Sequence, residues 1–159
     1  MNLATRPASL ILAVLLGAPW AASAAEPGAC TGTLTGAVTA RFACTVTTRV
    51  EGTQATLVVA VDGPVAGVRA LQPGTVSLAV PVASGTYSGA SLQRASSSLE
   101  TASGARYDAG AGRGEVTLTV DQAERYRQAP NHLVVSGSLK ARLVPAQAGP
   151  GEVVVEVRF

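Results

Sequence analysis

His132 is the only histidine in the chain, and histidine is the side chain best suited to acid–base chemistry near neutral pH. A serine hydrolase would need it beside a serine and a carboxylate, which can lie far apart in the sequence. No Gly-x-Ser-x-Gly segment is present to expose a serine nucleophile. His132 instead follows Pro130 and Asn131 at the start of an apolar run, as a strand-end residue does. We expect no catalytic residue, with a weak hydrolase built on His132 as an alternative.

The sequence also contains few residues that could bind a metal or a cofactor. One histidine and two cysteines, Cys30 and Cys44, cannot complete the four ligands of a zinc site. Asp108 and Glu115 lack the spacing of an EF-hand calcium loop. The glycine-rich residues 110–114 have the composition of a phosphate loop, but a strand pattern follows them, so no helix N-terminus is available to hold an anion. We therefore expect no metal and no cofactor.

The two cysteines lie on one face of an alternating segment. From Thr33 to Glu51 apolar residues share one parity with both cysteines, which indicates half-buried strand; they are Leu34, Val38, Ala40, Phe42, Val46 and Val50. One straight strand would separate the cysteines by about 45 Å, at about 3.3 Å per residue. A disulfide needs Cα atoms within about 7 Å, so the segment must turn at residues 36–38. We predict a hairpin that pairs Cys30 with Cys44, Gly32 with Phe42 and Leu34 with Ala40.

Further segments show the same alternation and predict the rest of the fold. The expected strands cover residues 53–61, 75–82, 115–120, 133–143 and 153–159, separated by turn residues such as Asp62-Gly63-Pro64 and Gln72-Pro73-Gly74. Pro81 marks an edge or the end of its strand. We predict an all-β, antiparallel β-sandwich of about seven to nine strands, closed by a hairpin of residues 133–143 and 153–159.

Two segments depart from the strand pattern. Residues 121–124 have the spacing of a capping box, and Pro130 follows soon after, which predicts one turn of helix. Residues 84–114 are dense in Ser, Gly and Ala and are expected to be the least structured part. A weak hairpin between Leu99 and Tyr107, turning at residues 102–104, is expected within them. Long loops on a rigid scaffold often carry binding function.

The N-terminus has the form of an export signal. Arg6 precedes a short apolar run, and Ala22-Ser23-Ala24 supplies small residues for cleavage, so we expect residues 1–24 to be a signal peptide and 25–159 a single domain. An uncleaved anchor or a lipidated Cys30 are alternatives, but the apolar run is far shorter than the about 20 residues of a membrane span. We expect an exported protein, periplasmic, on the outer surface or extracellular, with no transmembrane span after cleavage.

Charge and aromatic content exclude several kinds of partner. Without Arg6, eleven basic residues face ten acidic ones, and no basic stripe is present for nucleic acid. The only Trp, Trp20, lies in the expected signal peptide, and five aromatics remain: Phe42, Tyr87, Tyr107, Tyr126 and Phe159. This is a poor supply for stacking on sugars or bases. We expect no nucleic acid, and an unknown protein or surface as partner.

Three blocks of sequence resemble a group of small exported proteins from high-GC Gram-negative soil bacteria. They are residues 30–36 (CTGTLTG) with the second cysteine at Cys44, residues 114–120 (GEVTLTV), and residues 135–145 (VSGSLKARLVP) before a strand ending in Phe159. The motifs consist of structural glycines and strand residues. The resemblance implies an exported β-sandwich and carries over no catalytic or binding residue, since the group is uncharacterised.

These observations favour a non-enzymatic cell-envelope or secreted module with a binding or structural role. One alternative is a carrier of a small apolar ligand, with a cavity between sheets near residues 84–114. Another is an outer-membrane β-barrel, because the last strand alternates and ends in an aromatic residue; the five aromatics and short strands argue against it. A fimbrial subunit would need a longer arm before Cys30.

Overall fold

The computed structural model describes residues 28–125, 131–148 and 151–159. Ten strands and one short 3-10 helix lie in these ranges: β1 (Ala29–Gly36), β2 (Ala40–Glu51), β3 (Gln54–Val61), β4 (Val68–Ala79), β5 (Gly85–Ser88), η1 (Gly89–Ser91), β6 (Arg94–Thr101), β7 (Arg106–Gly110), β8 (Glu115–Arg125), β9 (Leu133–Pro145) and β10 (Val153–Arg158). The expected signal peptide, residues 1–24, lies outside the described residues. No helix in the three ranges is long and apolar enough to cross a membrane.

The predicted N-terminal hairpin is confirmed in its register and its disulfide. β1 and β2 pair antiparallel, with Cys30 opposite Cys44, Gly32 opposite Phe42 and Leu34 opposite Ala40. The two sulfurs are bonded, and the Cα atoms of the cysteines are 4.8 Å apart. β1 ends at Gly36 and β2 begins at Ala40, so the turn lies at the expected place.

The antiparallel all-β prediction is confirmed, but the sandwich is wrong: the sheet closes into a barrel. Eight strands form the ring in the order β10-β1-β2-β3-β4-β6-β7-β9, and β9 pairs with β10 to close it. The predicted hairpin of β9 and β10 is present, with Val153 opposite Leu143 and Arg158 opposite Ser138. Alternation tells which face of a strand is buried, but it does not tell which strands are neighbours. Both architectures therefore satisfy the same sequence pattern.

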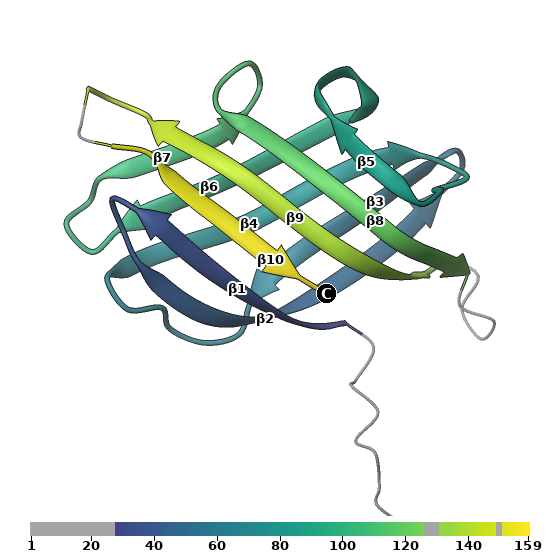
Figure 1. Cartoon of the computed structure of the whole chain (residues 1–159), viewed down its shortest axis with the longest axis horizontal. Helices are drawn as coiled ribbons and strands as arrows, with labels where there is room; N and C mark the ends of the chain where they lie inside the picture. The colour runs from purple at the N-terminus through teal and green to yellow at the C-terminus, as the bar shows by residue number, and fades with distance from the viewer. Residues whose placement is uncertain (1–27, 126–130, 149–150) are drawn as a thin grey trace, which may run out of the picture.

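Strands β8 and β5 extend this barrel along one edge of β9. β7 pairs with only two residues of β9, Val144 and Pro145, and β8 takes the rest of that edge from Arg142 back to Leu133. β5 then pairs with the middle of β8. In Figure 1, β1, β10, β9 and β8 lie in front and cross the strands β3, β4 and β6 behind them. The two groups of strands enclose one apolar core.

The barrel interior is filled by side chains, and glycines make room for the largest of them. Leu34, Leu118, Leu139 and Leu143 have no exposed surface. A Cβ atom on Gly74 would lie 2.8 Å from Cδ1 of Leu139, and one on Gly32 would lie 2.1 Å from Cζ of Phe42. A glycine facing a large side chain thus sets the wall spacing at each of these places.

One predicted turn, Gln72-Pro73-Gly74, is wrong. These residues lie inside β4, which runs unbroken from Val68 to Ala79. The pairing of β4 with β6 shifts register between Gln72 and Thr75, so the segment forms a bulge instead of a reversal. Proline and glycine occur both in turns and in bulges. At Gly74 a Cβ atom would lie 2.8 Å from Leu139 across the core, so glycine is needed inside this strand.

Two other predictions of local structure are corrected. Residues 121–124 are not helical but continue β8 to Arg125, because cross-strand hydrogen bonds override a local helix signal. Gln122–Arg125 pair with Leu133–Ser136 of β9, and Asp121 lies at a register shift. The region 84–114 contains β5, η1, β6 and β7 and is therefore largely structured. Its expected hairpin is confirmed, with Leu99 opposite Tyr107. β4 ends at Ala79, just before Pro81, as expected.

We predict that reducing the Cys30–Cys44 bond lowers the free energy of unfolding by about 3 kcal/mol, because it releases a loop of about 15 residues in the unfolded chain. Urea unfolding of the oxidised protein and of the protein kept in dithiothreitol measures the difference. The C30A/C44A double variant is the control, since the reductant should leave its midpoint unchanged. Equal stability of oxidised and reduced wild type would contradict the prediction.

A second prediction concerns the glycine opposite the only buried phenylalanine. Gly32→Ala is expected to destabilise the protein by about 1–3 kcal/mol, because the added methyl group overlaps the Phe42 ring. In a Phe42→Leu background the same substitution should cost markedly less, because the shorter side chain leaves room. Urea unfolding of the four proteins gives the coupling. Additive effects would show that the two residues do not constrain each other.

Candidate binding groove

An apolar groove opens in the barrel wall between β1 and β9, beside β2. Its volume is about 340 Å³. It is lined by residues from the start of β1, the middle of β2, the start of β9 and the end of the chain: Gly28, Ala29, Val46, Thr47, Thr48, His132, Leu133, Val134, Val135 and Phe159. We call this feature the wall groove.

The groove lies past the end of β10, which is shorter in the described structure than its two neighbours. β10 lies between β1 and β9 and pairs with both. Its last pair with β1 joins Arg158 to Thr31. On the other side, Phe159 and Gly137 exchange two backbone hydrogen bonds of 3.1 and 2.7 Å. Past Phe159, no described strand lies between β1 and β9, and the wall groove occupies that place.

A threonine hydroxyl closes the far end of the groove. The Leu133 N–H donates to Oγ1 of Thr48 over 2.9 Å, and the same hydroxyl bonds to the Leu133 carbonyl. Nearby, the Val50 N–H donates to the Asn131 carbonyl over 2.7 Å. β9 is thereby fastened directly to β2, without a strand between them. The sequence analysis did not identify Thr48 as a functional residue. The available signal was a threonine at a position of β2 where the other inward-facing residues are apolar.

The groove has an apolar floor and a mixed rim. Val46, Val135 and Phe159 pack against the core. Val134 lies at the rim and is 46% exposed. Among the described residues it is the one large hydrophobic side chain that is exposed. Thr47 and His132 add polar groups at the rim, and both are exposed. This lining suits an apolar or amphipathic ligand more than a charged one.

Among the described residues, the wall groove brings no serine or carboxylate to His132, as a hydrolase site would need. The residues that line the wall groove include no serine, aspartate or glutamate. In the described parts of the chain, no hydrogen bond or ion pair orients the His132 ring as a base. No three His, Cys, Asp or Glu residues in those parts are grouped as a metal site would require.

The disulfide lies directly beside the groove. Cys30 follows Ala29, and both cysteines point into the core, where Cys44 is 1% exposed. The Val46 N–H donates to the Gly28 carbonyl over 2.5 Å, so β1 is held on β2 on both sides of the bond. The first residues of β1 therefore form a fixed wall of the groove.

The glycine-rich residues 110–114 form a turn. Gly110 and Arg113 exchange two backbone hydrogen bonds of 2.7 and 3.0 Å around Ala111 and Gly112. Both central residues have positive φ, 50° and 83°, which is the geometry of a type I′ hairpin turn. Nη2 of Arg113 donates to the Pro145 carbonyl over 2.6 Å. This anchors the turn to the end of β9.

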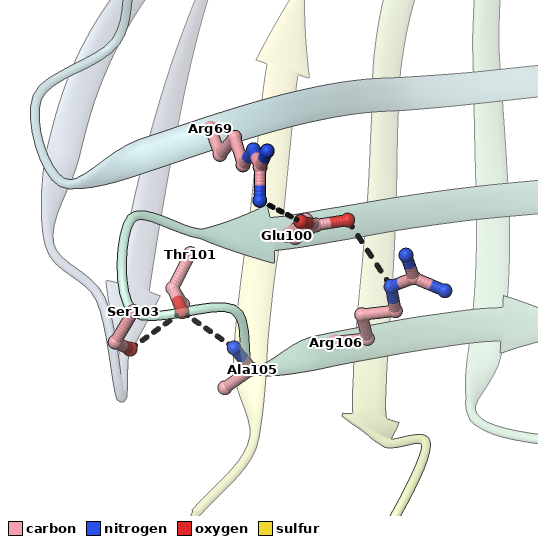
Figure 2. A network of polar contacts seen from close by, with 6 residues as sticks. All are labelled: Arg69, Glu100, Thr101, Ser103, Ala105 and Arg106. Carbon is pink, nitrogen blue, oxygen red and sulfur yellow. Dashed lines mark hydrogen bonds and ion pairs between the residues drawn. The ribbon is translucent and has the colours of Figure 1, made fainter.

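A second polar feature, on the outer face of β4, β6 and β7, is a network of ion pairs (Figure 2). The Glu100 carboxylate lies between the guanidinium groups of Arg69, at 3.3 Å, and Arg106, at 3.1 Å. Next to it, the Thr101 hydroxyl accepts from the Ala105 N–H and bonds to Ser103. Exposed ion pairs of this kind contribute little to stability, and these contacts connect three neighbouring strands.

The cleft beside residues 84–114 differs from the expected apolar cavity. It is open, about 920 Å³ in volume, and lies against β3, β4 and β6 between η1 and the turn after β7. Its lining is mixed and includes the charged residues Glu51, Arg94 and Glu115. Between β3, β4, β8 and β9 the interior space is only about 10 Å³. An apolar ligand would therefore fit the wall groove better than either place.

Comparisons with known proteins give no relative from which a site could be transferred. No protein family, curated protein or solved structure matches the chain. The resemblance of the three sequence blocks to exported bacterial proteins stays a prediction. The wall groove stands on its geometry.

We predict that Thr48→Val weakens the attachment of β9 to β2. The substitution keeps the shape of the side chain but leaves the Leu133 N–H without its acceptor, which costs about 1–3 kcal/mol of the free energy of unfolding. Thr47→Val is the matched control: Thr47 is exposed, and its substitution should change stability by no more than about 0.5 kcal/mol. Urea unfolding measures both. Equal effects would mean that the Thr48 hydroxyl does not hold β9.

Proposed function

We propose that this chain is an exported, non-enzymatic binding module that takes its ligand in the wall groove. The observation that carries the proposal is an apolar opening in a barrel wall whose outer surface is otherwise mostly polar. The outward positions of β2, for example, are Arg41, Ala43, Thr45, Thr47 and Arg49. Apolar surface gathered at one place on a polar protein commonly marks a binding site.

The disulfide supports export. Such bonds form and persist in oxidising compartments and are rare in the cytosol. Cys30 and Cys44 are bonded, and the described chain has no free cysteine. Together with the export signal expected at residues 1–24, this favours a location outside the cytoplasm.

The polar outer wall also favours a binding module over an outer-membrane barrel. A barrel in lipid carries an apolar band outside and polar residues inside. Here the inward positions are apolar, as at Val155 and Val157, and the outward neighbours Glu156 and Arg158 are charged. The arrangement is the reverse of the membrane pattern.

A carrier of a small apolar molecule is the second candidate, because the wall groove is of suitable size. Ligand pockets have volumes of about 300–1,000 Å³, and this groove has about 340 Å³. Its floor of Val46, Val135 and Phe159 would contact the ligand. The carrier would thus use the same site.

We predict that the protein binds N-phenyl-1-naphthylamine, a neutral apolar fluorescent probe, at one site. Val134→Lys should weaken this binding about fivefold, because it removes roughly 1 kcal/mol of apolar contact at the rim. Val154→Lys is the matched control, since Val154 also faces outward but pairs with Thr35 and Arg142, away from the groove. Fluorescence titration measures all three proteins.

Two results would refute the proposal. One is probe binding that is absent, or equal in the wild type and in Val134→Lys. The other is turnover of ester, peptide or glycoside substrates by the purified protein that disappears in His132→Ala. That loss would show that the histidine at the rim is catalytic.

A further inference from the structure

The wall groove is bordered on one side by an unpaired backbone edge of β1. The Gly28 carbonyl accepts from Val46 of β2, whereas the Ala37 N–H donates to Glu152, next to β10. Backbone groups of successive residues in a strand point to opposite edges. Even-numbered residues of β1 therefore pair with β2 and odd-numbered ones face β10. Ala29 is odd and lies beyond the last pair with β10, so its N–H and C=O face the groove.

β9 presents a matching edge on the other side. Gly137 pairs with Phe159, and Leu133 pairs with the Thr48 hydroxyl. Val135 lies midway between these two residues, so its N–H and C=O point to the same edge. In the described chain no strand covers that edge at Val135. Ala29 and Val135 thus leave two donors and two acceptors facing one strand-wide gap.

We infer that the wall groove binds an extended segment of a partner polypeptide, which enters the wall as a strand in line with β10. This inference rests on the proposed function and specifies its ligand. A guest strand in the direction of β10 is antiparallel to both β1 and β9, as β10 itself is. Pairing on an exposed strand edge is a general mode of peptide recognition.

The alternation fixes how the guest pairs. The guest residue that lies next to Phe159 in the wall exchanges two backbone hydrogen bonds with Ala29. The following guest residue exchanges two with Val135. The side chain of the second points inward, onto Val46 and Phe159, and must be apolar. From Gly137 to Leu133 the gap is about 13 Å long, at about 3.3 Å per residue, which admits a few residues before the Thr48 contact.

The geometry favours a free extended segment over other occupants. A guest strand between β1 and β9 forms hydrogen bonds on both of its edges, so it cannot also be paired with a strand of its own protein. The edge strand β5 of a second folded copy is excluded, because it is paired with β8. A small apolar molecule would fill the floor but leave four backbone groups unpaired, at a cost for each.

The test is backbone amide exchange in the full-length protein, measured by NMR. The probe is the peptide acetyl-Thr-Val-Thr-Val-Thr-amide, and the control peptide carries N-methyl groups on both valines. We expect the Ala29 and Val135 amides to exchange quickly in the free protein and at least tenfold more slowly with saturating peptide. The Val134 amide, which points toward β8, is the internal control and should not change. The N-methylated peptide should give no protection.

A variant tests the backbone pairing at Ala29. Ala29→Pro removes one donor at the groove edge, where proline is tolerated because no ladder bond is lost. It should weaken binding of the peptide about fivefold, because the guest strand loses one backbone hydrogen bond at the groove edge. Equal peptide affinity for Ala29→Pro and wild type would overturn the inference.

The remaining outcomes separate this inference from the proposed function. Ala29 and Val135 amides that exchange slowly in the free protein would overturn the inference, because the edges would already be paired, for instance within a dimer. Probe binding that depends on Val134, without protection by the peptide, would overturn the inference and leave the proposed function in place. Absence of both probe binding and peptide protection would overturn the inference and the proposed function.

Discussion

Pairing of β10 on both of its edges is the constraint on which the rest of this structure depends. β10 joins the N-terminal hairpin, through β1, to the C-terminal hairpin, through β9. Without it the same strands would form an open sheet with two long exposed edges, which proteins generally avoid. Closure instead directs one face of eight strands inward. The apolar face of β10 itself, Val153, Val155 and Val157, is almost completely buried as a result.

The same strand explains the groove, because β10 is too short for its position. It has six residues, whereas β9 has thirteen. Where β10 stops, β9 reaches across to β2, and the Thr48 hydroxyl bonds to the Leu133 backbone as a neighbouring strand would. At this end, the side chain of Thr48 therefore completes the closure of the barrel. The gap left between Phe159 and that contact is the wall groove.

The proposed binding site lies in the wall of the barrel, because the interior is occupied. Leucine and valine side chains fill the interior, and Gly32 and Gly74 give space to Phe42 and Leu139. A filled interior resists change in shape, since added volume has no place to go. The outer surface is largely polar, and its charges form pairs such as Lys140 with Glu156. Unpaired backbone and apolar surface come together at the groove.

The sequence by itself determined the strand character of most segments, the disulfide and the register of its hairpin. Those features depend on residues near one another in the chain: alternation assigns the buried face, and bond geometry brings Cys30 to Cys44. Tertiary structure alone decided that the sheet closes, that residues 72–74 form a bulge, and that residues 121–124 remain extended. Each depends on which strand lies alongside in the folded sheet, and a period of two does not identify that partner. The wall groove belongs to this second group, because it arises from the unequal lengths of strands that meet only when the barrel closes.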